Sequence, residues 1–526
     1  MATNSKLGQL RDILLVQFGT RFVTFGINIL IARVAPQNEY GVTFVSFQFY
    51  LNLTLFLAAE CFRKVAQRRS QKGDVDAGYH FRSALNVTWA GVWITAFIVL
   101  FSTAYWLTDA PESKRISYMI SMSLLSVAVM VEAAAEPFLL MVIGKGDFVN
   151  KAIGESAALF TRTIFMGIIT VVTGDVMLAF ASAQLVYGTI WLLFLGRMHP
   201  PWVSEGADDP LPAQLDDDGT IFLSEHKSAL KQFLMSSFLK LMLQEGEKPI
   251  VLGLFSESQW GEFALVQNLG SLVLRLLFKP IEELAYASFG QAKKKSESLA
   301  LLQGLLFLQG GVGWLGLCYG PAFASVVIRI LYGATWAASN APALLGAYCL
   351  QLFAMASNGI LEGYLMARAD DVWLRRAQIA HVVFFVIFCG MVYGLKDIGL
   401  VSVVYATSSS MLLRCALSIV FIQQESASSE PNASEKTNET KSDRDFTLPY
   451  ARIGMAAVSF FVSGQFCGFI LGGWQPATDP LPIKLLGIAF VVAAGSIVAI
   501  GGATWKFCGL RDAVKMLQDQ RREKTE

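Results

Sequence analysis

Charged side chains interrupt several long apolar runs of this sequence. Arg21, Lys240 and Arg275 lie near the middle of such runs. A charge in the hydrocarbon region of a bilayer costs at least about 2.5–3.5 kcal/mol on insertion scales, so it should face the protein interior, a partner or a cavity. Cations outnumber acids at this depth, and arginine binds phosphate oxygens in a bidentate fork. The pattern therefore favours a central cavity that binds an anion.

The other candidate residues of this cavity lie inside apolar runs or at their ends. They are Arg63, Arg162, Glu245, Glu247, Lys279, Glu282 and Glu362. Ion pairing across a helix bundle is the alternative role, and long side chains near the membrane surface can reach water. We favour function for the three deep cations and leave both roles open for Arg63, Lys279 and Glu282.

Composition places the chain among membrane proteins. Of its 526 residues, 54% are hydrophobic and only 16% are charged, whereas soluble proteins carry about 25% charged residues. The net charge is +1 and no basic patch is interleaved with aromatic residues, so nucleic acid is not expected as a partner. The seven cysteines lie mostly inside apolar runs or at their ends, which favours packing over disulfides or metal ligands.

Apolar runs separated by polar turns predict about fourteen transmembrane helices. We place them near 10–33, 41–62, 83–107, 116–142, 152–173, 176–198, 229–254, 260–287, 298–318, 341–366, 374–395, 398–423, 450–472 and 482–506. The stretch 322–332, which contains Arg329, either extends the preceding helix or lies at the membrane interface.

The order of the helices repeats within the chain. Tyr40-Gly41 and Trp260-Gly261 each open the second run of a pair of apolar runs. The sequence EPFL at 136–139 returns as EGYL at 362–365, at nearly the same offset. Two echoes at a similar spacing favour a duplicated fold with two homologous six-helix lobes. Deep cations on equivalent helices can then converge on one cavity.

The repeat and the polar stretches predict the division of the chain. The parts are an N-terminal lobe (1–198), an acidic linker (199–228), a C-terminal lobe (229–423), a disordered loop (424–446), two further helices (447–506) and an amphipathic tail (507–526). The linker should be solvated, because it carries runs of aspartate. Basic residues cluster in alternate loops, which places both termini and the linker in the cytosol.

Signatures of soluble enzymes are missing. The sequence has no HExxH, Walker A or G-x-S-x-G motif, and its four histidines show no ligand spacing. We therefore expect no enzyme activity, no cofactor and no metal ion, and the lack of a nucleotide site argues against a primary pump.

Several blocks of the sequence resemble a known family. In the second lobe these are SFLK at 237–240, QEGE at 244–247, QNLGSLVLRLLFKPIEE at 267–283 and NGILE at 358–362, and in the first lobe RFVTF at 21–25 and TLFLAAECFRK at 54–64. They resemble the eukaryotic Rft family of oligosaccharide-diphosphodolichol translocation proteins. The resemblance implies the multidrug/oligosaccharidyl-lipid/polysaccharide exporter superfamily, in which two six-helix lobes form a V around a cavity. It also implies an endoplasmic reticulum membrane protein required for N-glycosylation.

The favoured interpretation is a transporter that moves dolichol-diphosphate-linked Man5GlcNAc2 from the cytosolic to the luminal leaflet. Arg21, Arg63, Lys240 and Arg275 would attract the diphosphate, while the polyprenyl tail stays in lipid. Its partners would be this lipid and membrane lipids, with glycosyltransferases of the dolichol pathway as further candidates. A non-transporting accessory protein that binds the lipid or organises those enzymes is the alternative.

Two other classes fit less well. An ion-coupled multidrug antiporter could use Glu132, Glu136 and Glu362 as a proton relay, but these residues lie toward one end of their helices. A polytopic glycosyltransferase would need larger luminal loops than this sequence predicts.

Overall fold

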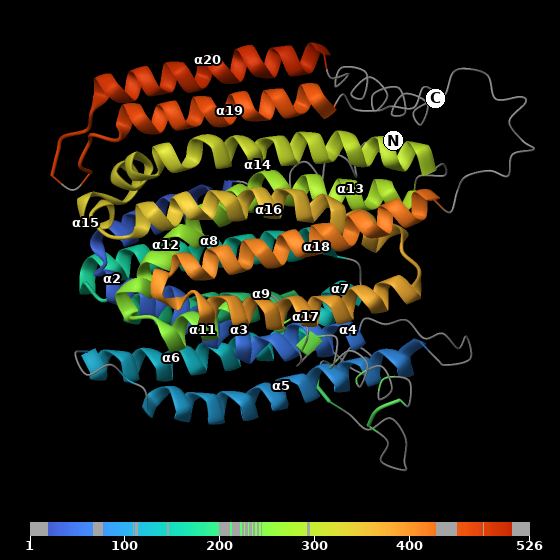
Figure 1. Ribbon diagram of the computed structural model, residues 1–526. Helices are drawn as coiled ribbons and strands as arrows, with labels where there is room; N and C mark the ends of the chain where they lie inside the picture. The colour runs from blue at the N-terminus through green and yellow to red at the C-terminus, as the bar shows by residue number, and fades with distance from the viewer. Residues whose placement is uncertain are drawn as a thin grey trace, which may run out of the picture. The chain divides into compact units, whose positions relative to one another are not determined.

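A computed structural model of the chain describes residues 19–20, 22–66, 77–108, 110, 114–144, 147–198, 211–212, 221–223, 226, 230, 234, 237–238, 241–242, 245–291, 295–427, 450–476 and 478–507 (Figure 1). Every regular element among these residues is a helix. A helix satisfies the backbone N–H and C=O groups within one segment, which the hydrocarbon of a bilayer demands.

The predicted helices are confirmed wherever the structure describes them. The described residues contain ten helices long and apolar enough to cross a membrane, and each coincides with one predicted range. Three shorter apolar helices, Phe22–Val34, Met455–Leu471 and Ile483–Ala499, fall on the predicted first, thirteenth and fourteenth helices. Ten of the 26 residues of the predicted seventh helix, near 229–254, lie outside the described residues. The chain is an all-helical polytopic membrane protein.

The chain divides into two compact units, Met1–Ala264 and Leu265–Glu526. The elements of the first unit are α2 (Gln37–Gly41), η1 (Val42–Phe47), α3 (Gln48–Phe56), η2 (Leu57–Phe62), α4 (Arg63–Ala66), α5 (Ala77–Thr108), α6 (Arg115–Ala134), α7 (Glu136–Gly144), α8 (Phe148–Thr173), α9 (Val176–Met198) and α11 (Glu247–Leu254). Helix α12 (Glu257–Val273) contains the boundary between the units.

Two π-helical segments, η1 and η2, interrupt the first long span of this unit, and η2 ends immediately before Arg63. Gly91 of α5 lets η2 pack closely, because a Cβ at this position would lie 2.9 Å from the Cβ of Phe62. The second unit has a π-helical segment at the corresponding place, η5, which ends immediately before Lys279. Such segments widen the helix locally and are frequent at functional sites.

The repeated aromatic–glycine pairs meet inside the first unit. A Cβ on Gly41 would lie 2.9 Å from the Cβ of Trp260 and still closer to the backbone of α12. Beside them, Ser258 Oγ donates a hydrogen bond to Gln37 Oε1 at 3.1 Å. The glycine is therefore needed for close approach of two helix ends that the repeat makes equivalent.

The second unit is built from η5 (Leu274–Phe278), α13 (Lys279–Gln291), α14 (Lys295–Tyr332), α15 (Ala334–Ala337), α16 (Ala341–Arg368), α17 (Asp371–Gly394), the 3-10 turn η6 (Lys396–Ile398), α18 (Val401–Ala427), α19 (Tyr450–Leu471) and α20 (Ile483–Phe507). Helix α16 packs against α14, α13 and α18, while α19 packs between α14 and α20 (Figure 1). The stretch 322–332 continues α14 as a helix beyond Pro321.

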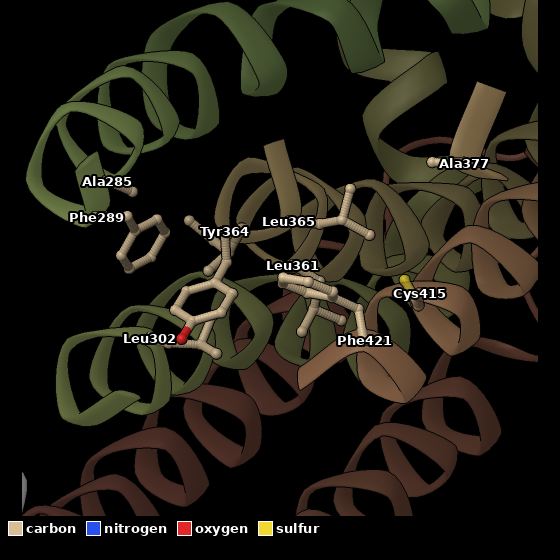
Figure 2. Packing of buried hydrophobic residues seen from close by; sticks show 10 residues of the cluster. Ala285, Phe289, Leu302, Leu361, Tyr364, Leu365, Ala377, Cys415 and Phe421 are labelled. Atoms are coloured by element: carbon tan, nitrogen blue, oxygen red, sulfur yellow. The ribbon is translucent and has the colours of Figure 1, made fainter. Parts of the chain in front are cut away.

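Helix α16 carries the core of the second unit (Figure 2). The ring of Tyr364 lies 5.1 Å from that of Phe289 on α13, edge to face, and 6.5 Å from that of Phe421 on α18. Edge-to-face pairs of this kind add to the stabilisation that burial provides. This cluster therefore fixes α13 and α18 on either side of α16.

One part of the linker is not solvated, contrary to the prediction. His226 is only 2% exposed, and Phe222 packs against the apolar core of the first unit. The physical reason is that Phe222 and Leu223 are apolar residues within the acidic stretch, and both side chains gain free energy when they are partly buried.

Candidate functional site

Arg63 and Glu136 form an ion pair in the first unit. Arg63 is the first residue of α4, and Glu136 is the first residue of α7. The Nε of Arg63 donates to Oε2 of Glu136 at 2.7 Å, and its Nη2 donates to Oε1 over a shorter distance. The two side chains are 29% and 9% exposed. This bidentate fork is the geometry in which a guanidinium also binds phosphate.

Other ion pairs lie close to it along the chain. Lys64 Nζ is 2.6 Å from Glu60 Oε2, one helical turn away, and Lys151 Nζ is 3.4 Å from Glu155 Oε2. Each is partly exposed, and pairs of this kind contribute little to stability. The charges at this end of the first unit are therefore largely balanced.

Arg162 lies on α8, and one N–H group of its guanidinium has no hydrogen-bond acceptor among the described residues. Its guanidinium carbon is 5.1 Å from the centroid of the Phe180 ring on α9, a cation–π contact. No described residue hydrogen-bonds its Nε. Glu132 accepts a 2.7 Å hydrogen bond from Gln184 Nε2, also on α9. A buried anion could therefore be bound here.

Glu245 takes part in a polar network of the first unit. Its Oε2 is 2.7 Å from Nζ of Lys248, and its Oε1 accepts from Nδ2 of Asn52 at 2.9 Å. Asn52 in turn accepts from Gln48 Nε2 at 2.9 Å. The side chains of Glu245 and Lys248 are 16% and 13% exposed. The network neutralises Glu245 and joins α3 to the segment before α11.

Glu282 lies on α13 of the second unit and packs against α16. Its Oε1 accepts a 2.9 Å hydrogen bond from Gln309 Nε2, and the same amide nitrogen reaches the carbonyl of Ala356 at 3.1 Å. A Cβ at Gly359 would lie 3.0 Å from Cγ of Glu282. The carboxylate is thus seated on a glycine of α16, and its described partner is an amide rather than a cation.

Glu362 lies one turn further along α16. Its Oε2 accepts from Asn358 Nδ2 at 2.8 Å, and its Oε1 is 3.8 Å from Nε2 of His381 on α17. His381 is 7% exposed. The partners of this carboxylate are therefore an amide and an imidazole.

The remaining predicted residues are placed less completely. Arg275 in η5 and Lys279 at the start of α13 have exposed side chains, and Glu247, the first residue of α11, is half-buried. Arg21 and Lys240 lie outside the described residues, so their position remains a prediction.

The sequence reasoning missed the neutral partners of these charges. They are Asn52, Gln184, Gln309 and Asn358, all amides inside long helices. The signal that could have found them is the amide itself, because a polar side chain within an apolar run needs a hydrogen-bond partner.

A cavity of about 660 Å³ lies within the second unit. It is lined mainly by α14 and α16, with Ala337 of α15, Tyr405 of α18 and Pro476 beside them, and every lining side chain is uncharged. Because its lining carries no charged side chain, this cavity is not a candidate for binding an anion. Within the described residues no group of three or more histidine, cysteine or acidic side chains could hold a metal ion.

The comparison with known proteins decides the family. A profile described as the Rft protein matches residues 8–489, which is far more than half of the chain. The chain belongs to the Rft family. This membership confirms the resemblance that the sequence blocks indicated.

Relatives of this Rft-family chain are similar along most of its length. The Man(5)GlcNAc(2)-PP-dolichol translocation protein RFT1 of Xenopus tropicalis is 27% identical over 451 residues, covering 80% of this chain and 82% of the relative. The protein of that name in Mus musculus is 25% identical, covering 80% and 83%. The one in Schizosaccharomyces pombe is 23% identical over 512 residues, covering 91% of both chains.

Solved structures establish the fold of this Rft-family chain. The lipid II flippase MurJ in an inward closed conformation matches with a TM-score of 0.63 at 11% identity, covering 94% of this chain and 98% of MurJ. An inward-facing multidrug resistance transporter of the MATE family, in the MOP superfamily, matches with a TM-score of 0.59 at 11% identity, covering 78% and 96%. The predicted superfamily fold is confirmed.

Proposed function

We propose that this protein moves dolichol-diphosphate-linked Man5GlcNAc2 from the cytosolic to the luminal leaflet of the endoplasmic reticulum membrane, for protein N-glycosylation. The observation that carries the proposal is membership of the Rft family, whose relatives named for translocation of this lipid match about four fifths of the chain or more. The transporter fold supports it. Both termini lie in the cytosol in this proposal, following the positive-inside rule.

Arg63 is the residue whose geometry best supports diphosphate binding. Its guanidinium already holds two oxygens of Glu136 in a fork. Two phosphate oxygens present the same acceptor geometry and more charge, so a diphosphate can replace the carboxylate. Glu136 would then remain at the N-terminus of α7, where the helix dipole favours a negative charge. Binding is thus an exchange of anions on one arginine.

The other predicted residues complete the proposed cavity. Arg21, Arg162, Lys240, Arg275 and Lys279 supply further positive charge to the diphosphate. The carboxylates of Glu245, Glu247, Glu282 and Glu362 accept hydrogen bonds from sugar hydroxyl groups. The polyprenyl tail stays in the bilayer, because a chain of apolar carbons has no reason to leave lipid.

The proposal is tested with purified protein in proteoliposomes. Translocation of a diphosphate-linked oligosaccharide lipid is measured for the natural chain and for a variant with both Arg21→Gln and Arg275→Gln. Fast movement that the double variant loses would support a flippase and its cation site. No movement above protein-free liposomes, from folded protein that still binds the lipid, would refute transport and favour an accessory role in the same pathway.

A further inference from the structure

The linker docks on the first unit through a small set of described residues. Asn86 Nδ2 of α5 donates to the carbonyl oxygen of Ile221 at 2.9 Å. One turn away, Ser83 Oγ accepts from the backbone N–H of Leu223 at 3.0 Å and shares a 2.7 Å hydrogen bond with Nδ1 of His226. These three bonds join two residues of α5 to three residues of the linker.

The docking site is buried rather than superficial. Ser83 is completely buried, and Asn86 and His226 are each 2% exposed. Burying an imidazole and an amide costs free energy unless each finds hydrogen-bond partners. Ser83 bonds to the imidazole of His226, and the amide of Asn86 bonds to the linker backbone, at 2.7 and 2.9 Å. A linker surrounded by water would have no need of such buried partners.

Phe222 of the linker and Leu230 just after it cover the apolar core beside the candidate site. Phe222 and Leu230 pack against a cluster formed by Cys61 and Phe62 of η2, Val65 and Ala66 of α4, Ala84, Leu85 and Val87 of α5, and Leu140 and Met141 of α7. Helix α4 begins with Arg63, and α7 begins with Glu136. The cluster therefore joins the two helices that carry the ion pair.

We propose that the linker residues Ile221, Phe222, Leu223 and His226, together with Leu230 just after the linker, form a linker clasp. This clasp positions Arg63 for its anion by holding α4 against α5 and α7. The occupant of the docking site on α5 is this chain's own linker. The clasp acts through packing, and none of its residues touches the substrate. The effect of the clasp on transport rests on the proposed function, whereas the docking of the linker on α5 does not depend on it.

Helix α4 (Arg63–Ala66) is the last turn of the long helical span Gln37–Ala66. The last turn of a helix frays more easily than its middle, because its final carbonyl groups have no partner within the helix. The apolar contacts of Val65 and Ala66, which are both nearly inaccessible to solvent, therefore help to hold this turn in place. Removing the clasp exposes one side of the cluster to water. The position of Arg63, the first residue of α4, then becomes less fixed.

Docking is tested by two variants that break it from opposite sides. The variant with Ser83→Ala and Asn86→Ala changes α5, and the variant with Phe222→Ala and His226→Ala changes the linker and leaves the sequences of α4, α5 and α7 unchanged. Ser102→Ala is the matched control, because among the described residues the Ser102 hydroxyl of α5 bonds only to carbonyls of its own helix. Amide hydrogen exchange of 221–226 is measured by mass spectrometry in lipid nanodiscs.

Positioning is read from Cys61, which is fully buried within the cluster. Its alkylation by N-ethylmaleimide is followed by peptide mass spectrometry. We expect both variants to exchange the linker amides and to alkylate Cys61 at least about tenfold faster, a change that corresponds to about 1.4 kcal/mol. His226→Asn, which keeps a hydrogen-bonding nitrogen or oxygen near Ser83, should restore protection that His226→Ala loses.

Each outcome decides a separate point. Unchanged exchange at 221–226 in both variants would refute docking. Faster exchange with unchanged alkylation of Cys61 would refute positioning. The full pattern together with impaired N-glycosylation, in cells that depend on this protein, supports the clasp and its role. The full pattern with normal N-glycosylation supports the clasp as structure and counts against Arg63 as a substrate ligand.

Discussion

Glu136 and Glu362 occupy matching places in the two repeats, yet the structure gives them different partners. Glu136 holds the guanidinium of Arg63, whereas Glu362 accepts a hydrogen bond from Asn358 and lies beside His381. The duplicated sequence has thus kept the carboxylate and changed the charge around it. An arginine carries a permanent charge and an amide carries none. The first unit can therefore offer a permanently charged guanidinium to an anion by exchange, whereas the described partners of Glu362 are an amide and an imidazole.

The largest expected effect comes from removing Arg63. Arg63→Gln leaves the carboxylate of Glu136, only 9% exposed, without its cation. Breaking a buried pair from one side typically costs 3–5 kcal/mol, and the partial exposure of Arg63 places this case at about 3 kcal/mol. The change in free energy of unfolding is measured in detergent by denaturant titration, and N-glycosylation is measured in dependent cells.

The double variant Arg63→Gln with Glu136→Gln separates stability from function. It should recover most of the lost stability, because no unpaired charge remains. It should not recover N-glycosylation, because the cation is still missing. Recovery of both properties would show that the pair is structural and would remove the main difference between the units.

A smaller effect is expected where Glu282 packs against α16. Gly359→Ala places a Cβ against the carboxylate of Glu282, so the side chain must move and lose its bond to Gln309. A net hydrogen bond contributes about 0.5–1.5 kcal/mol, and up to about 3 kcal/mol when one partner is charged, while the better helix propensity of alanine offsets part of this loss. We expect a loss of stability of about 1 kcal/mol by thermal unfolding in detergent.

Gly363→Ala is the control for this prediction. Gly363 lies on the same helix and has no atom within 4 Å of an added Cβ. It should be neutral or stabilising, because alanine is the better helix former. Equal destabilisation by both variants would mean that Glu282 is not seated on Gly359.

The smallest loss is expected from neutralising Glu362. Glu362→Gln keeps an oxygen for the amide of Asn358 and loses only the charge near His381, at a side chain that is 25% exposed. The expected cost is about 0.5 kcal/mol, as for partly exposed ion pairs. Glu136→Gln should cost several times more, since it leaves Arg63 unpaired. Similar costs in a side-by-side unfolding assay would contradict the difference between the units.

The helices were predictable from the sequence, but the pairing of charges was not. An apolar run long enough to cross a membrane has few alternatives to a helix, so each long span coincides with a predicted range. Which charges meet depends on which helices are neighbours, and a single sequence does not contain that information. Arg63 was therefore a candidate without a partner. The amide Gln309 drew no attention, because it carries no charge to mark it.

The linker was misread for a related reason. Its aspartates predicted a solvated stretch, whereas the few apolar residues at its end decide where it goes. Average charge describes how a segment interacts with water as a whole, and it hides three adjacent apolar side chains. The sequence shows no metal-ligand spacing around His226 and does not indicate the role that the structure gives this residue, which is that of a buried hydrogen-bond partner of Ser83.

The comparison can be sharpened by building the pair of the first unit into the second. Glu282→Arg would place a guanidinium against α16 at Gly359, three residues before Glu362 and on the same face of that helix. A new pair with Glu362 should give a coupling energy of about 0.5–1 kcal/mol in a double-mutant cycle with Glu362→Gln.

Glu283→Arg is the matched control, because it makes the same change of charge at the neighbouring exposed side chain. Coupling at 282 alone would mean that the repeats share a backbone able to hold this pair and that side-chain identity made them differ. Equal coupling at 282 and 283 would mean that the effect is long-range attraction, and that α13 does not place residue 282 as α4 places Arg63.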